Sequence, residues 1–278
     1  MFEGRILLIA TQHGKEKVIA PILEKTLGVT CVVNHLLDTD SLGTFSGEIE
    51  RKLDPIATVR QKCLLAATHH NIDLVIANEG SFGSHPTLFF SAADDEFVMF
   101  VDLKNNLEII ARELSTATNF GGENITTQQQ LLAFAEASFF PTHALILKSS
   151  EKKPTVIYKA IQKENDLLEK FHHLKKTYET LFVETDMRAH LNPSRMNLIE
   201  KVTQKLVKKI QSCCPNCKTP GFDIVKVLDG LPCQLCKSPT KSTLAFVYQC
   251  KKCAFQTTAK FPHKKQFEDP MYCDFCNP

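Results

Sequence analysis

Four C-x-x-C pairs near the end of the 278-residue chain carry the clearest chemistry in the sequence. Two cysteines spaced in this way, here called a knuckle, present both sulfurs to one metal ion at about 2.3 Å. Two knuckles complete a tetrahedral Cys₄ shell, which leaves no open position, so eight cysteines predict two structural zinc sites rather than catalytic ones. The predicted ligands are Cys214, Cys217, Cys233, Cys236, Cys250, Cys253, Cys273 and Cys276.

The spacing leaves open which knuckles share an ion. Sequential pairing, first with second and third with fourth, encloses 15 and 19 residues. Nested pairing fits about as well. The segments between the knuckles alternate as β-strands do, which is typical of zinc ribbons; they are DIVKVL, TLAFVYQ and FQTTAKF.

Cysteine usage also divides the chain. Nine of the eleven cysteines follow residue 212, so we predict domains at 1–211 and 212–278. Such crowding favours metal binding over disulfides in a reducing compartment, and we expect a cytoplasmic protein.

The formal net charge of +2 gives no global basic field that would require nucleic acid or anionic lipid. The apolar run over residues 6–11 is too short for a membrane span, so no membrane partner is expected.

The elements before residue 212 must position any further site. Their periodicity predicts a strand, a helix and a second strand over residues 4–33, which is the pattern of a parallel pair with a crossover. Further strands are predicted at 72–79, 96–113 (a hairpin), 142–147 and 180–186, with helices from residues 55 and 193. Residues 148–180 suggest two short helices. The fold class is therefore α/β, with a mixed, partly parallel central sheet, flanking helices and a small C-terminal zinc-ribbon-like module.

Charged side chains gather where these predicted strands end. Carboxylates can hold Mg²⁺ and orient its bound water, whereas cations neutralise phosphate. Glu79, Glu50 and Glu48 are the candidate catalytic carboxylates. The candidate ligand-binding residues are Lys15, Lys17, Arg112, Asp186 and Arg188. Each has a plainer interpretation: Glu48 and Glu50 as a solvated edge, and Asp186 with Arg188 as a surface ion pair.

Part of this pattern resembles a known family. Over roughly the first 120 residues, the chain remotely resembles the inosine/xanthosine triphosphate pyrophosphatases. The stretches that carry the resemblance are ATQHGKEKVIAPILEKTLG, PIATVRQKCLLAA, DLVIANEGSFG and FVMFVDLKNNLEIIARELSTATNF. The resemblance implies that Thr11 and Lys15 hold a triphosphate and that acidic Mg²⁺ ligands follow the third strand. This sequence departs from the family at Gln12-His13, at Ala57 and at Asn78-Glu79. The whole chain, knuckles included, also resembles an uncharacterised bacterial family.

Two functions follow as hypotheses. The first is an Mg²⁺-dependent nucleotide-binding protein or nucleoside triphosphate phosphohydrolase with structural zinc, acting on a nucleotide or another phosphorylated small molecule. The alternative is a zinc-ribbon adaptor for nucleic acid or protein on a non-catalytic α/β scaffold. Lys251 and Lys252 would then contact nucleic acid, although lysines that merely solvate the surface explain them better. The zinc module could also support a homodimer.

Overall fold

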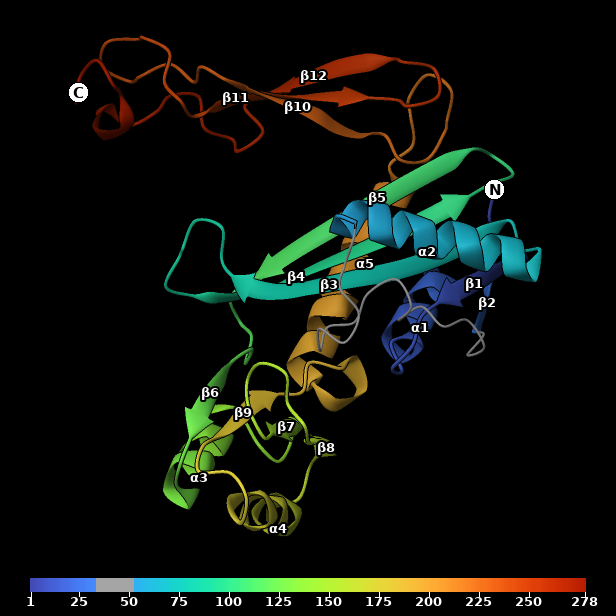
Figure 1. Ribbon diagram of the computed structural model, residues 1–278. Helices are drawn as coiled ribbons and strands as arrows, with labels where there is room; N and C mark the ends of the chain where they lie inside the picture. The colour runs from blue at the N-terminus through green and yellow to red at the C-terminus, as the bar shows by residue number, and fades with distance from the viewer. Residues whose placement is uncertain (34–52) are drawn as a thin grey trace. The chain divides into compact units, whose positions relative to one another are not determined.

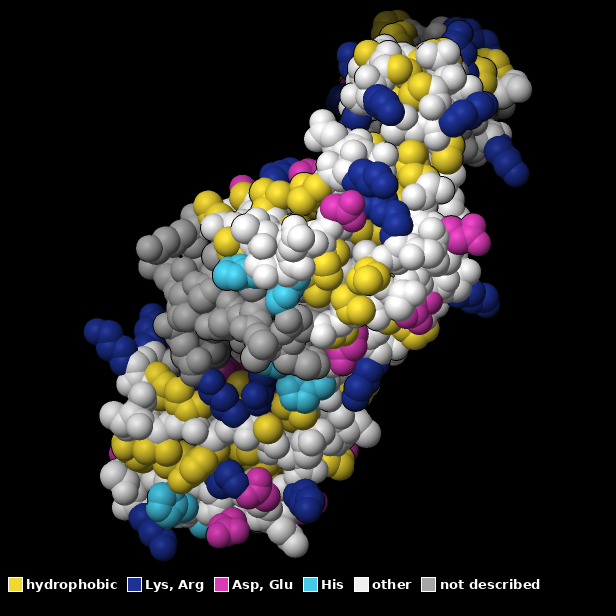
Figure 2. All heavy atoms as spheres, turned by 90° about the vertical axis from the view of Figure 1, so that its right-hand side faces the viewer, with side chains coloured by type: hydrophobic (Ala, Val, Ile, Leu, Met, Phe, Trp, Pro, Cys, Tyr) yellow, Lys and Arg dark blue, Asp and Glu magenta, His cyan; other side chains and the backbone are white. Residues whose placement is uncertain are grey.

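The computed structural model describes residues 1–33 and 53–278 (Figure 1). The chain divides into two compact units, Met1–Leu206 and Val207–Pro278. A mixed α/β architecture with a partly parallel central sheet, flanking helices and a C-terminal cysteine cluster confirms the predicted fold class. The candidate carboxylates Glu48 and Glu50 lie outside the described residues. Basic and acidic side chains are interspersed on the face drawn in Figure 2, in agreement with the small net charge.

The central sheet of the first unit has the order β2-β1-β3-β4-β5. Its strands are β1 (Ile6–Ala10), β2 (Thr30–Val33), β3 (Leu74–Ser84), β4 (Ala92–Asp102) and β5 (Leu107–Ser115). Strand β1 runs parallel to β2 and β3, whereas β3, β4 and β5 form an antiparallel meander. The parallel strands therefore deliver their carboxyl ends to one edge of the sheet, where ligands usually bind in open α/β folds.

Two helices connect the parallel strands. Helix α1 (Glu16–Leu27) ends at Gly28, whose φ of 67° allows its N–H to donate to the carbonyl of Glu24. Helix α2 (Pro55–His70) begins after Asp54, whose carboxylate accepts the N–H groups of residues 56 and 57. One face of the sheet packs on α2 through a core that includes Val59, Cys63 and Met99. Both helices form where the sequence predicts them.

A second sheet completes this unit, with the order β6-β9-β7-β8 and antiparallel pairing throughout. Its strands are β6 (Gly122–Ile125), β7 (Leu145–Lys148), β8 (Ile157–Ile161) and β9 (Leu181–Thr185). Its helices are α3 (Gln128–Ala137) and α4 (Glu164–Lys175) (Figure 1). The expectation of two helices over 148–180 is wrong, because β8 occupies the first part and pairs with β7. The short helix η2 (Ala189–Leu191) precedes α5 (Pro193–Gln211).

The second unit is built on three antiparallel strands, β10 (Asp223–Asp229), β11 (Thr243–Gln249) and β12 (Gln256–Lys260). A short helix, η3 (Pro270–Tyr272), precedes the fourth knuckle. Among the described residues of the chain, no helix is both long and apolar enough to cross a bilayer.

Candidate functional site

The eight predicted zinc ligands form two groups of four in the second unit. The first tetrad is Cys214, Cys217, Cys250 and Cys253, and the second is Cys233, Cys236, Cys273 and Cys276. Within each tetrad the four Sγ atoms lie within 4.8 Å of one another. Sγ–Sγ separations between the paired knuckles run from 3.5 to 3.8 Å. A tetrahedral shell with Zn–S bonds of about 2.3 Å has edges of about 3.8 Å, so both tetrads could hold zinc.

The knuckles pair in an interleaved way, the first with the third and the second with the fourth. Sequential and nested pairing, the two alternatives weighed from the spacing, are both wrong. The physical reason is strand direction. One strand separates each knuckle from the next, and the strands are antiparallel, so consecutive knuckles lie at opposite ends of the sheet. The odd knuckles share one end and the even knuckles share the other.

All four knuckles share one backbone hydrogen bond. The N–H four residues after the first cysteine donates to that cysteine's carbonyl, at 2.8–3.1 Å, from Lys218, Lys237, Ala254 and Asn277. The first three of these residues adopt left-handed conformations, with φ of 61°, 65° and 57°. This tight turn brings the two sulfurs of each knuckle to one side.

Hydroxyl groups close to the sulfurs favour the thiolates that zinc requires. The Thr219 hydroxyl lies 3.2 Å from Cys217 Sγ, and hydrogen bonding from Thr219 lowers the pKa of this thiol to about 6. Ser238 acts in the same way at the second tetrad and lowers the pKa of Cys236 to about 6. The donor set is therefore chemically suited to a divalent zinc ion at each end of the sheet.

In the first unit, a chain of buried polar groups begins at Lys15, the N-cap residue of α1. Lys15 Nζ donates to Asn78 Oδ1 at 3.0 Å, and Asn78 Nδ2 donates to Glu96 Oε2 at 3.1 Å. Arg195 Nε, from α5, donates to Glu96 Oε1 at 2.7 Å. Burial, followed by repulsion from Arg195, lowers the pKa of Lys15 to about 7. The ammonium group of Lys15 is thus already hydrogen-bonded within the protein.

Glu79 belongs to the other face of the sheet. It follows Asn78 in β3, and successive side chains of a strand point to opposite faces. Its carboxylate accepts from Lys62 Nζ of α2 at 2.6 Å, and Glu79 is only 3% exposed. Lys15 and Glu79 therefore have different partners, Asn78 and Lys62, on opposite faces of β3.

Arg112 is also paired with a carboxylate, and strands β3 and β4 lie between its strand, β5, and β1. Its guanidinium donates two hydrogen bonds to Asp95, both at 2.8 Å, and lies over the ring of Phe97. The strand register sets Arg112 opposite Phe97, which itself faces Glu79, so these three residues share the face on which α2 packs.

Asp186 and Arg188 form an ion pair at the end of β9. Asp186 is fully buried and accepts from Arg188 Nε at 2.9 Å and from the N–H of Ala160 at 3.1 Å. Despite burial, the Arg188 hydrogen bond contributes to a lowered pKa for Asp186. Both carboxylate oxygens are used within the protein. The predicted ion pair is therefore present, with a buried carboxylate and a partly exposed guanidinium.

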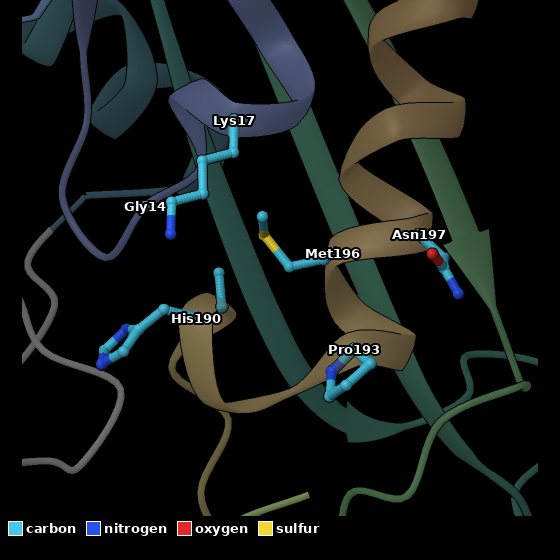
Figure 3. Close-up of a pocket in the computed structure, with 7 residues that line it drawn as sticks. Gly14, Lys17, His190, Pro193, Met196 and Asn197 are labelled. Atoms are coloured by element: carbon cyan, nitrogen blue, oxygen red, sulfur yellow. The ribbon is translucent and has the colours of Figure 1, made fainter. Parts of the chain in front are cut away.

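A pocket of about 270 Å³ opens at the start of α1 (Figure 3). Its lining residues are Gly14, Lys17, Ala189, His190, Pro193, Met196 and Asn197. Figure 3 shows Met196 pointing from α5 into the space between the start of α1 and the segment of His190. The ring of His13 stacks on that of His190, with centroids 5.3 Å apart. Partial burial, then the charge of His13, lowers the pKa of His190.

Of the predicted ligand-binding residues, Lys17 lines this pocket and Thr11 does not. Thr11 is buried, and its hydroxyl donates to the carbonyl of Gln12 at 3.1 Å. His190 and Met196 were not predicted, because no local pattern in a short helix and an amphipathic helix marks them as pocket residues. They line the pocket because η2 and α5 lie beside the start of α1.

The sequence reasoning also overlooked Asp94, Glu96 and Arg195. Asp94 is 2% exposed, and its Oδ1 has no hydrogen-bond partner among the described residues. Burial, followed by repulsion from Glu96, raises the pKa of Asp94 to about 8. The predicted hairpin began only at Glu96, whereas β4 begins at Ala92, so the alternation of Asp94 and Glu96 on one face of this strand was missed.

Comparisons with known proteins give a family and no activity. The family model described as a domain of unknown function (DUF6671) matches residues 62–278, which include all eight tetrad cysteines. No curated protein matches the chain. Among solved structures, the hypothetical protein CT253 from Chlamydia trachomatis is 10% identical. That match covers 42% of this chain and 76% of the other, with a TM-score of 0.21.

Proposed function

The chain belongs to the DUF6671 family, and because the description of that family names no activity, we propose a function from the sites alone. We propose that the unit Met1–Leu206 binds a phosphorylated small molecule, such as a nucleotide, in the pocket at the start of α1. The unit Val207–Pro278 carries two cysteine tetrads that could hold structural zinc. The observation that supports the proposal is the meeting of Lys17, His190 and the backbone of Gly14 around one hollow.

The chemistry of this hollow suits an anion. The N-terminal end of a helix carries partial positive charge, and the N-cap residue of α1 makes no side-chain cap hydrogen bond. Lys17 adds a full positive charge, and the stacked imidazoles of His13 and His190 add an aromatic surface that fits a base. A phosphate bound beside His190 would favour its protonated form.

Magnesium-dependent hydrolysis is the stronger form of this proposal, and the described residues lend it no support. A hydrolase of this kind needs carboxylates that reach a metal-bound water. Glu79 pairs with Lys62 on the opposite face of the sheet, and Asp186 is held by Arg188. Among the residues that the structure describes, no Asp or Glu lines the pocket. The proposal is therefore one of binding.

A titration of phosphate, pyrophosphate and a panel of nucleotides into the full-length protein tests it, with heat or fluorescence as the readout. Lys17→Ala should weaken binding by about tenfold, the equivalent of one hydrogen bond to a charged group. Lys25→Ala is the matched control, because Lys25 lies in the last turn of the same helix, is exposed and does not line the pocket. Equal affinities for the two variants, or no binding of any phosphate compound by the wild type, would refute the proposal.

The pH dependence of binding supplies a second readout. Since the pKa of His190 lies below its usual value in the free protein, a bound phosphate should draw a proton onto the ring as the pH falls. Binding should therefore tighten on acidification from neutral pH. His190→Gln should bind with a weaker dependence on pH, and an unchanged dependence would show that the ring does not contact the ligand.

A further inference from the structure

The second cysteine tetrad is surrounded by large apolar side chains that face solvent. Leu235, Met271, Tyr272 and Phe275, here called the apolar patch, are 72%, 60%, 62% and 76% exposed. Leu235 lies inside the second knuckle and Phe275 inside the fourth, and Met271 and Tyr272 immediately precede the fourth. Because the sulfurs of these two knuckles lie within 4.8 Å of one another, the four side chains occupy one end of the unit.

The first tetrad shows that holding the metal does not require apolar residues at these positions. The residues equivalent to Leu235 and Phe275, immediately before the second cysteine of a knuckle, are Asn216 and Lys252. The same backbone hydrogen bond closes all four knuckles, so the geometry is matched. Asn216 Nδ2 donates to Cys253 Sγ at 3.7 Å, a contact that leucine and phenylalanine cannot make. The apolar residues therefore have a purpose other than coordination.

The charges beside the apolar patch indicate what kind of partner fits. Lys241 pairs with Asp274 at 2.7 Å, and Lys265 pairs with Glu268. Glu268 is buried, but Lys241 and Asp274 are both exposed. A nucleic acid would meet the carboxylate of Asp274, whereas a surface that carries both signs is complementary to a second copy of itself. Aromatic residues and methionine are also enriched in the cores of protein interfaces.

The charge of the whole unit supports the same choice. Residues 207–278 contain eleven lysines and five acidic residues, a formal charge of +6 before the thiolates are counted. Each zinc ion with four thiolates would add a net charge of about −2, which removes most of this excess. Little electrostatic attraction for a polyanion then remains at the second tetrad.

We propose that the apolar patch is the contact through which two copies of this chain associate. An isologous contact would set the patch of one copy against the same patch of the other, and Lys241 of each copy near the exposed carboxylate of Asp274 of the other. This inference is independent of the phosphate-binding pocket. It depends on the second tetrad being correctly folded, which the zinc content of each variant reports.

Sedimentation equilibrium of the full-length, zinc-loaded protein tests the inference. At micromolar concentrations we expect the wild type to have twice the mass of the chain. Phe275→Ser should raise the dissociation constant of the dimer at least tenfold while two zinc ions remain bound. Lys252→Ser is the matched control, because it changes the equivalent exposed position of the first tetrad and should leave the dimer intact. Leu235→Ser provides a second variant, from the other knuckle of the same tetrad.

Three results would overturn the inference. The first is a wild type that stays monomeric throughout the micromolar range. The second is a Phe275→Ser protein that dimerises as tightly as Lys252→Ser. The third is a monomeric wild type that binds single-stranded nucleic acid in a salt-dependent manner lost in Phe275→Ser, which would assign the patch to base stacking instead.

Discussion

The interleaved pairing of the knuckles makes a prediction about zinc content that no other pairing makes. Strand β10 has 7 residues. At about 3.4 Å per residue it separates the two ends of its sheet by about 24 Å. The sulfurs around one zinc ion are only about 3.8 Å apart. A knuckle at one end therefore cannot complete the shell of a knuckle at the other while the sheet remains intact.

Three variants, each with four cysteines changed to serine, separate the possible pairings. Removing the first and third knuckles should leave one zinc ion per chain, because the second tetrad stays complete. Removing the first and second knuckles, or the first and fourth, should leave none that is tightly bound, because both tetrads are then reduced to two cysteines. All three variants lose the same number of thiols, so each serves as a control for the others.

The expected difference in affinity is large. A complete structural zinc site is worth about 10–16 kcal/mol of apparent binding free energy. If half the ligands supply about half of this, a two-cysteine remnant loses about 5–8 kcal/mol, or roughly four to six orders of magnitude in affinity. Metal analysis by mass spectrometry, after dialysis against a chelator of intermediate affinity, resolves this difference.

One result would refute the reasoning. If the variant without the first and second knuckles kept one zinc ion and the variant without the first and third kept none, the pairing would be sequential. The antiparallel arrangement of β10, β11 and β12 would then be wrong as well, since the strand directions require the interleaved pairing.

The buried charges of the first unit give three further predictions, each measured by urea denaturation. The pKa of Asp94 is about 8 in the folded chain and near 3.8 when unfolded, so its contribution to stability is present below pH 3.8, declines as the pH rises, and is lost above about pH 8. Between these pH values the free energy of unfolding should therefore fall with pH, by at most about 1.4 kcal/mol per pH unit. Asp94→Asn should remove this pH dependence, and an unchanged dependence would contradict the raised pKa of Asp94. A Cβ at Gly80 would lie 2.3 Å from the carboxylate of the buried ion pair on its face, so Gly80→Ala should cost about 2–4 kcal/mol. Gly83→Ala, which meets nothing within 4 Å, is the control and should change stability by no more than about 0.5 kcal/mol. Lys62→Met removes the ion-pair partner of a buried carboxylate and should cost about 3–5 kcal/mol, part of which Glu79→Gln should restore in the double variant.

Local patterns in the sequence were sufficient for much of the fold. Helical spacing of apolar residues, the cap at Asp54 and the glycine at position 28 predict α1 and α2, and the structure contains both. The hairpin around Asn106 is likewise present, with the φ of 50° that its turn requires. These features depend on a few consecutive residues, which is why they can be predicted without the tertiary structure.

The cysteine spacing predicted two tetrads but not their membership. The information was partly in the sequence, since a single predicted strand between successive knuckles places them at alternate ends of an antiparallel sheet. What the spacing lacked was the direction of each strand, and direction is decided by the pairing of β11 with both β10 and β12.

The polar site of the first unit shows where sequence reasoning stops. Lys15, Glu79 and Arg112 all lie near predicted strand ends, but strand alternation and register distribute them over two faces of the sheet. The ion pair that organises the face beside Lys15 joins Glu96 to Arg195, residues separated by 99 positions. Residue types and spacing therefore determined the metal chemistry and most of the elements. The order, direction and register of the strands decided which charges meet, because these depend on contacts between distant segments that no local period encodes.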